Sequence, residues 1–317
     1  MTAGGARTGA RRPPIGFVVL TYADPPQIAR LIARLRALYG PDAPIALHHN
    51  FSQSELGAAL PDGVRLVRPH FETGWGTWAT VEATLAALRL LYAGGDGPEY
   101  VVNLSGTDYP VAPQECVLAD LRGGRADAYI KAMPVSPWRR DRRATPRPLG
   151  FGPNESGPNQ KVCYRRYYPT TFRPLGIRIR VRSPLLAPLF SPFSRRFPCC
   201  AGEHWWTLGR RAVEHLLDAH ERRPDLAQWF AERHIPEEAY VHTIVANGTG
   251  LRVDLRNFRY VDWSSYARSP RFLVEGDVPR VLASGAHFAR KFAMDAPALH
   301  AIDAALGLGP WRDGAPA

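Results

Sequence analysis

Two neighbouring glutamates are the first residues of this chain whose type and setting could do chemistry. Glu237 and Glu238 follow Pro236 at the predicted start of an amphipathic helix. Proline in the first turn and acids beside it suit a helix amino terminus, where the amide dipoles favour negative charge. A carboxylate fixed there, near Trp205 and Trp206, could act as a general base toward a ring-shaped substrate that carries hydroxyl groups. The alternative is an ordinary capped helix whose tryptophans belong to the core.

A third acid follows a buried strand predicted over residues 100–104. This strand runs into Ser105, Gly106, Thr107 and Asp108. Glycine permits a close approach of the backbone, and the aspartate is presented at the strand end. That pattern suits a binding turn, and it equally suits a plain junction in which Asp108 caps the next segment.

The elements that must position these residues begin with a continuous apolar run over 15–20, which is typical of a buried parallel strand. A helix is predicted over 28–39, and further strands over 45–48 and 64–67. This order predicts a doubly wound α/β sheet, in which ligands lie beyond the carboxyl ends of the strands. In this chain that edge carries Thr21, Tyr22 and Asn50. Neither a G-x-G-x-x-G motif nor a P-loop is present, which disfavours dinucleotide-binding and NTPase functions.

The composition indicates a globular protein with anionic partners. The chain has 317 residues, of which 45% are hydrophobic and 22% charged, and its net charge is +11. This charge favours nucleotide-sugars, phosphates, nucleic acid or an acidic membrane. The cysteines are too few for a disulfide scaffold and lack the spacing of a zinc site. We therefore expect a soluble, cytoplasmic protein, with peripheral contact to an anionic membrane through its arginines as a further option.

Taken together, the motifs resemble the Core-2/I-branching β-1,6-N-acetylglucosaminyltransferase family, which also contains peptide O-xylosyltransferases. The resemblance extends from Ile15 to Phe292 and rests on the number and order of the matching runs. These runs are IGFVVLTYADPPQIARLI, GWGTWATVEATLAALRLL, YVVNLSGTDYPV, GEHWWTLGRRAVEHLL, PEEAYVHTIVANG, RYVDW and HFARKF.

The resemblance implies a single GT-A-like domain of the α/β class, with a Rossmann-like, mostly parallel central sheet flanked by helices. It implies an inverting transfer of a sugar from a UDP-sugar to a carbohydrate or glycoconjugate acceptor, with no metal or cofactor. UDP-N-acetylglucosamine is the expected donor, and UDP-xylose is the alternative. After a disordered basic stretch over 1–14, we expect the domain to cover 15–310. It would comprise a nucleotide-sugar half (15–133), a loop-rich acceptor-side insertion (134–198) and a catalytic, diphosphate-binding part (199–310).

The resemblance also assigns the charged residues of the reaction. The base corresponds to Glu238, and the lysine that stabilises the departing diphosphate corresponds to Lys291. Its arginine partner corresponds to Arg268 by spacing or to Arg271 by its place after a proline. The chain lacks the Asp-x-Asp motif with which most GT-A enzymes hold a metal, and a lysine and an arginine can neutralise a leaving diphosphate directly.

The remaining assignments concern the sugar and the nucleotide. Aromatic faces pack well on sugar rings, and a polar strand edge suits uridine. Family members commonly have aspartate where Asn50 stands. The residues expected to line the acceptor and sugar pocket are Trp205, Trp206, Trp263 and Glu203, and those expected at the donor nucleotide are Tyr22, Asn50 and Asp108.

Two other classes of function compete with a transferase. The charge and the arginine- and aromatic-rich region over 138–197 would suit a non-catalytic module that binds nucleic acid or polysaccharide. Asp108 and Glu238 could instead form the carboxylate pair of a glycoside hydrolase. That chemistry leaves the basic cluster near Lys291 without a purpose. We expect no nucleic acid partner.

Overall fold

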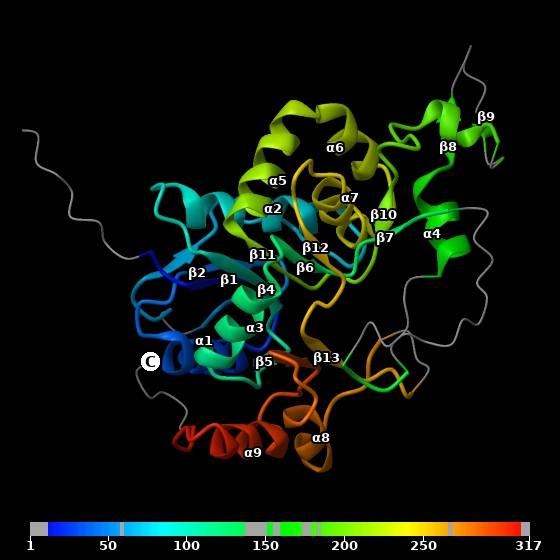
Figure 1. Cartoon of the computed structure of the whole chain (residues 1–317). Helices are drawn as coiled ribbons and strands as arrows, with labels where there is room; N and C mark the ends of the chain where they lie inside the picture. Colours follow the sequence, from blue (N-terminus) through cyan, green and yellow to red (C-terminus); the bar gives the residue numbers. More distant parts are fainter. Residues whose placement is uncertain are drawn as a thin grey trace, which may run out of the picture.

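A seven-stranded mixed sheet forms the centre of the molecule (Figure 1). The computed structural model describes residues 12–57, 60–136, 151–154, 159–172, 179–181, Ser183, 185–265 and 269–311. The strands follow the order β12-β6-β11-β4-β1-β2-β3. Their bounds are Ile15–Thr21 (β1), Ile45–His49 (β2), Val64–Leu66 (β3), Tyr100–Ser105 (β4), Ala128–Ile130 (β6), Trp206–Gly209 (β11) and Val253–Asp254 (β12).

The sheet is mostly parallel, as the sequence predicts. Strand β1 pairs in parallel with β2 and β4, β3 pairs in parallel with β2, and β12 pairs in parallel with β6. Strand β11 is antiparallel to both of its neighbours, β4 and β6. The carboxyl ends of β1, β2 and β4 therefore meet at one edge, where Thr21, His49 and Ser105 lie.

Helices cover both faces of the sheet, so the architecture is that of an α/β protein (Figure 1). In Figure 1 the helices α2, α5, α6 and α7 lie on one side, and α1, α3, α8 and α9 on the other. Their bounds are Pro25–Tyr39 (α1), Trp78–Tyr92 (α2), Gln114–Gly124 (α3), Gln160–Tyr167 (α4), Arg210–Arg222 (α5), Pro224–Ala231 (α6), Tyr240–Ala246 (α7), Val278–Leu282 (α8) and Pro297–Ala305 (α9).

Two hydrophobic cores result, one on each face, because successive strand side chains point in opposite directions. On β1, Val18 belongs to the core under α2 and α5, whereas Phe17 and Val19 belong to the core over α1. Burial on both sides is the reason why β1 reads as a continuous apolar run rather than an alternating one.

A smaller three-stranded sheet carries the C-terminal charged motif to the edge of the main sheet. It has the order β13-β14-β5, with bounds Arg259–Val261 (β13), Phe288–Arg290 (β14) and Asp108–Pro110 (β5). Strand β14 runs antiparallel to β5, so Arg290 lies opposite Asp108, and it runs parallel to β13, so Arg290 also neighbours Val261. Residues far apart in the sequence thereby become neighbours.

The other elements are short. Met133–Pro134 (β7) pairs with Cys200–Ala201 (β10), and Thr170–Phe172 (β8) pairs with Ile179–Val181 (β9). Turns of 3₁₀ helix cover Ala187–Phe190, Pro236–Glu238 and Glu275–Asp277. Within the described ranges, no helix has the length and hydropathy needed to span a bilayer.

Candidate active site

Glu238 lies in a short turn rather than at the first turn of a long helix. Pro236–Glu238 form a 3₁₀ turn, and α7 begins only at Tyr240. The backbone of Ile235 is left-handed, with φ 57°, and that of Ala239 is also outside the helical region, with φ −142°, so neither end of the turn continues as α-helix. The two glutamates are therefore held by a turn, which corrects the expected helix start.

The two glutamates point to different surroundings. Glu237 is buried, and its Oε1 accepts a hydrogen bond of 3.0 Å from the backbone N–H of Gly76. The side chain of Glu238 is 36% exposed, and its Oε2 forms a 3.0 Å ion pair with Arg166 of α4. Of the two carboxylates, Glu238 is thus the one that a substrate could reach.

The electrostatic setting of Glu238 makes its carboxylate a stronger base than an ordinary glutamate. Burial raises its pKa above the ordinary value of glutamate, the cation of Arg166 opposes this shift, and the carboxylate of Glu203 adds to it. A general base is most effective when its pKa approaches the working pH.

Glu203 lies on the segment that passes between Glu238 and the basic cluster. Its carboxylate accepts hydrogen bonds of 3.2 Å from Lys131 Nζ and Asn257 Nδ2. The preceding Gly202 donates its N–H to the carbonyl of Glu238 at 2.9 Å. A Cβ at Gly202 would lie 1.6 Å from the carbonyl oxygen of Lys131, so only glycine allows this close approach.

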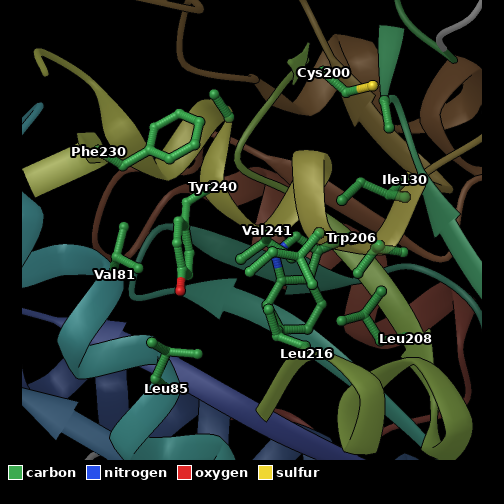
Figure 2. Packing of buried hydrophobic residues seen from close by; sticks show 14 of the residues in the cluster. Val81, Leu85, Ile130, Cys200, Trp206, Leu208, Leu216, Phe230, Tyr240 and Val241 are labelled. Carbon is green, nitrogen blue, oxygen red and sulfur yellow. The ribbon is translucent and has the colours of Figure 1, made fainter. Parts of the chain in front are cut away.

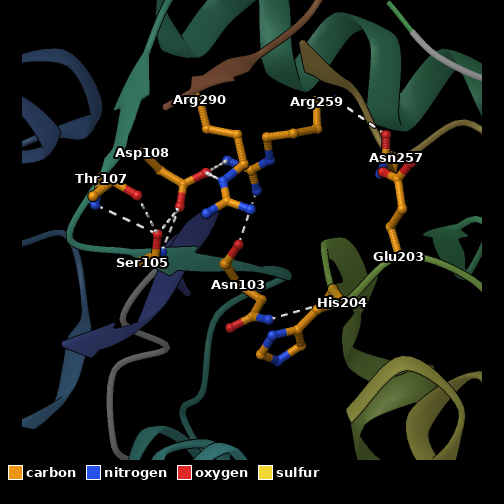
Figure 3. Close-up of polar contacts among 9 residues, drawn as sticks. All are labelled: Asn103, Ser105, Thr107, Asp108, Glu203, His204, Asn257, Arg259 and Arg290. Atoms are coloured by element: carbon orange, nitrogen blue, oxygen red, sulfur yellow. Dashed lines mark hydrogen bonds and ion pairs between the residues drawn. The ribbon is translucent and has the colours of Figure 1, made fainter. Parts of the chain in front are cut away.

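Asp108 holds two arginines at the other end of the segment (Figure 3). Its Oδ1 lies 3.0 Å from Nη1 of Arg259 and 3.6 Å from Nε of Arg290, and its Oδ2 accepts the N–H of Ser105. Arg259 also donates to the carbonyl of Asn103 at 2.8 Å. Burial lowers the pKa of Arg259 to about 10, and Asp108 opposes this shift, so the arginine stays charged at neutral pH.

Arg290 links this cluster back to the segment of Glu203. Its guanidinium carbon lies 4.0 Å from the ring centroid of Trp205, within the range of a cation–π contact. Burial lowers the pKa of Arg290, while the carboxylates of Asp108 and Glu203 oppose that shift. The arginine is therefore positioned by an aromatic face and two acids.

Lys291 follows directly and is half-buried. Its Nζ lies 6.0 Å from the ring centroid of Phe272, and its carbonyl accepts the N–H of Leu273 at 2.7 Å. Burial lowers the pKa of Lys291, the cation of Arg290 lowers it further, and Asp108 opposes the shift. Two adjacent cations at a strand end are a favourable setting for an anion such as a diphosphate.

Trp206 is not a pocket residue, contrary to the sequence-based expectation. Its side chain is fully buried, and it packs in the core with Ile130, Leu208 and Leu216 (Figure 2). The reason is alternation along the chain: Trp205 faces Arg290, so its neighbour at the start of β11 faces the opposite way.

Arg271 is also reassigned. Its guanidinium forms ion pairs of 2.6 Å with Asp262 and Asp277, and the hydrogen bonds to Asp277 raise its pKa. Because two carboxylates neutralise its charge, Arg271 stabilises the loop before α8 rather than facing a diphosphate. Arg268 lies outside the described residues.

Two expected donor contacts have their polar atoms occupied by the protein. Asn50 is buried; its Nδ2 donates to the carbonyl of Thr73, and its Oδ1 accepts from the N–H of Ser52. Asp108 is fully buried and engaged by Ser105 and the arginines. Both residues shape the strand edge instead of contacting a nucleotide directly, and the burial of Asp108 also disfavours a hydrolase carboxylate pair.

The remaining predicted residues lie at the same edge of the fold. Tyr22 directly follows β1 and is 58% exposed. Trp263 is partly buried two residues beyond the end of β13, at the edge where β14 ends in Arg290. Within the ranges that the structure describes, no three His, Cys, Asp or Glu side chains gather as a metal-binding group.

Comparison with known proteins gives a family for this geometry. The Core-2/I-Branching enzyme family matches residues 15–280, which is most of the chain. This chain is a member of the Core-2/I-branching family. The match ends before Lys291, so the C-terminal basic motif lies beyond the matched residues.

Individual relatives of this Core-2/I-branching protein are distant. It is 26% identical over 251 residues to the β-glucuronosyltransferase GlcAT14B of Arabidopsis thaliana, covering 76% of this chain and 51% of the relative. It is 24% identical over 322 residues to the xylosyltransferase oxt of Drosophila pseudoobscura pseudoobscura, covering 90% and 32%. The chain thus spans about half the length of the plant relative and a third of the fly relative.

A solved structure of mannose-1-phosphate geranyltransferase from Thermus thermophilus aligns with a TM-score of 0.31 at 14% identity, covering 76% of this chain and 72% of that one. At that level the likeness carries no weight for fold or activity. The fold assignment comes from the mostly parallel sheet with helices on both faces.

Three residues of the site of this Core-2/I-branching member are not among those that the sequence assigns to it. Arg259 and Arg290 stand in the runs RYVDW and HFARKF, but only their pairing with Asp108 distinguishes them from surface arginines. Arg166 lies in the least patterned part of the chain. An arginine on an otherwise apolar strand, as in both runs, is the available signal for the first two.

Proposed function

We propose that this chain is an inverting, metal-independent glycosyltransferase that moves a sugar from a UDP-sugar to an acceptor hydroxyl. Membership of a family of glycosyltransferases supports the type of reaction. In this proposal Glu238 is the general base, and Lys291 with Arg290 stabilises the departing diphosphate. Arg290 takes the role that the sequence assigns to Arg268 or Arg271.

The observation that carries the proposal is the position of the short segment Gly202–Trp205. At one end Gly202 donates a hydrogen bond to the carbonyl of Glu238, and at the other end Trp205 stacks on Arg290. The backbone that carries the acid, and one of the cations, therefore contact the two ends of one short stretch of chain. A sugar ring between them would meet a base on one side and positive charge on the other.

The proposed chemistry needs one proton acceptor and one anion site. The acceptor oxygen forms a bond to the anomeric carbon as its proton passes to the carboxylate of Glu238. The bond from that carbon to the β-phosphate oxygen breaks on the opposite face, and its electron pair leaves with UDP. Lys291 and Arg290 stabilise the charge that develops on the diphosphate.

The identity of the donor sugar is a further part of the proposal. The family resemblance of the sequence favours N-acetylglucosamine, with xylose as the alternative. The names of the relatives add glucuronic acid. These three sugars differ at the C2 and C5 substituents, so a panel of the three UDP-sugars ranks them directly.

The test combines this donor panel with a variant of the proposed base. We expect UDP to raise the melting temperature of the protein and one UDP-sugar to be hydrolysed or transferred in the presence of EDTA. Glu238→Gln should lower the turnover number by on the order of 10²–10⁴ while UDP still stabilises the protein, because the base is removed and the anion site is kept. Glu232→Gln, which changes an exposed acid nearby, is the matched control.

Three outcomes would reject the proposal. A Glu238→Gln protein with full activity would remove the assigned base. No effect of UDP together with salt-dependent binding to DNA or RNA would favour the binding module. Cleavage of aryl glycosides without any nucleotide would favour a hydrolase.

A further inference from the structure

The segment from Asn159 to Gly202 has a one-sided charge. It contains no aspartate or glutamate. Its basic residues are Lys161, Arg165, Arg166, Arg173, Arg178, Arg180, Arg182, Arg195 and Arg196. Such a stretch attracts an anionic surface. It has no carboxylates that could pair with the basic residues of a partner protein, as a surface of mixed charge would need.

The same segment exposes an unusual group of aliphatic side chains. Leu185 is 72% exposed, Leu186 50% and Leu189 74%, and Val162 on α4 is 46% exposed. Half of the large apolar side chains that are exposed in the described ranges belong to this segment. Single exposed apolar residues are ordinary, whereas a group of them marks an interaction surface.

Two anchors hold the leucines beside α4. The hydroxyl of Tyr164 donates to the carbonyl of Ser183, just before the leucines, at 3.3 Å. After them, Phe193 packs on Tyr168 at the end of α4, with ring centroids 5.2 Å apart. The leucine run, which includes the 3₁₀ turn Ala187–Phe190, is thus held at both ends beside α4, and α4 lies at the periphery of the molecule (Figure 1).

Exposed cations flank the leucines on both sides. On α4 these are Lys161 and Arg165, and after the second anchor they are Arg195 and Arg196. We define the leucine–arginine patch as Lys161, Val162, Arg165, Leu185, Leu186, Leu189, Arg195 and Arg196. Exposed aliphatic side chains flanked by cations are the combination with which peripheral proteins insert into a membrane interface.

We propose that the leucine–arginine patch docks this protein on the surface of an anionic lipid bilayer. The arginines and lysine approach the charged headgroups, and the leucines enter the boundary with the acyl chains. A nucleic acid would use the cations but not the leucines, since it is bound through phosphates and stacked bases. The docking is independent of the proposed transferase reaction, although α4 connects the two sites because Arg166 on this helix pairs with Glu238.

The test is co-sedimentation of the full chain with vesicles of phosphatidylcholine alone and of equal parts phosphatidylcholine and phosphatidylglycerol. We expect binding to the anionic vesicles and little to the neutral ones. Leu185→Ser with Leu189→Ser should weaken the partition coefficient by roughly tenfold or more, because the apolar insertion is lost. Arg195→Gln with Arg196→Gln should weaken it by roughly tenfold and leave a shallower salt dependence.

A matched control replaces two exposed apolar side chains elsewhere. Val274 and Met294 are 58% and 48% exposed, and Val274→Ser with Met294→Ser should bind vesicles as the unaltered protein does. Unchanged melting temperatures would show that the leucine and arginine variants fold. Hydrolysis of the UDP-sugar by the leucine variant separates this proposal from the proposed function, since docking can fail while the reaction persists.

The proposal is overturned if the unaltered protein ignores anionic vesicles, or if the leucine variant binds them equally well. It is also overturned if light scattering shows a dimer that the leucine variant converts to a monomer, because the patch would then be a self-association surface. Binding to nucleic acid without binding to vesicles would overturn it as well.

Discussion

At the scale of single residues, the two adjacent glutamates lie in different environments although they are neighbours in the sequence. Glu238 meets Arg166 at a partly exposed position, whereas Glu237 is buried against the backbone of Gly76. In the described part of the chain, Oε2 of Glu237 has no hydrogen-bond partner. A buried carboxyl with one unsatisfied oxygen favours the protonated form.

This environment predicts that Glu237 makes its own pH-dependent contribution to the stability of the fold. Burial raises the pKa of Glu237 from an ordinary 4.5 to about 7, against the opposing hydrogen bond from Gly76. The folded state therefore holds this proton more tightly than the unfolded state. Its stabilising contribution is complete below about pH 4.5 and is lost as the pH rises through 7.

Glu237→Gln keeps the acceptor for Gly76 and cannot ionise. We expect this variant to be more stable than the unaltered protein at pH 8, by up to about 3 kcal/mol, and of similar stability at pH 5. Thermal or urea unfolding at the two pH values measures the difference, with exposed Glu232→Gln as the control. Equal destabilisation at both pH values would mean that the folded protein holds Glu237 ionised.

At the scale of elements, strand β11 separates two tryptophans that the sequence presents as a pair. Trp206 on the strand is fully buried in the core (Figure 2), and Trp205 before it lies against Arg290. Their aromatic character predicts burial or sugar contact for both. Which one turns to the core depends on the register of β11 with β4 and β6, and that register is a tertiary property.

Truncation of the two tryptophans should therefore affect different properties, stability for Trp206 and catalysis for Trp205. Trp206→Ala leaves a cavity in a packed core and should cost about 3–5 kcal/mol of unfolding free energy. Trp205→Ala should cost less stability and should lower kcat/KM by roughly tenfold or more, because Arg290 loses the face that positions it. Urea unfolding and steady-state kinetics on both variants measure this; a larger loss of stability in Trp205→Ala would contradict the assignment.

The predictability of other elements follows the same physical division. The strands over 15–21 and 100–105 are evident because burial on both faces requires continuous apolar runs. The turn that holds Glu238 resembles a helix start in sequence, since Pro-Glu-Glu suits the first turn of an α-helix and of a 3₁₀ helix equally. Local composition does not contain the backbone angles at Ile235 and Ala239 that decide between them.

Some charged residues of the site can likewise be predicted from the sequence, and others cannot. Glu238 and Lys291 come from the order of motifs, and in the structure Gly202 contacts the backbone of Glu238 while Trp205 contacts Arg290, the neighbour of Lys291. Arg271 and Arg290 look alike in sequence, yet Asp262 and Asp277 neutralise the first, and Asp108 holds the second beside Trp205. Only ion pairs between distant segments separate a bracing arginine from one that can meet a ligand.

At the scale of the whole molecule, the site is assembled from three distant parts of the chain. Strand β5, just after β4, supplies Asp108, the region from β10 to the 3₁₀ turn supplies Glu203 and Glu238, and the end of β14 supplies Arg290 and the following Lys291. Figure 3 shows Asp108, Glu203 and Arg290 together. The small sheet β13-β14-β5 places the C-terminal strand β14 beside Asp108. Positive charge thereby lies beside the strand edge at which α/β proteins bind their ligands.

This arrangement predicts how the reaction responds to metals. If fixed cations stabilise the leaving diphosphate, turnover of the UDP-sugar should be the same with EDTA as with added Mn²⁺. Lys291→Ala should lower kcat by on the order of 10²–10³, and Mn²⁺ should fail to restore it, since the described site offers no group of three metal ligands. Steady-state rates with and without EDTA measure both effects, with exposed Lys161→Ala as the control for a lost lysine. A strict requirement for Mn²⁺, or full activity in Lys291→Ala, would mean that the charge on the diphosphate is neutralised by something other than this strand.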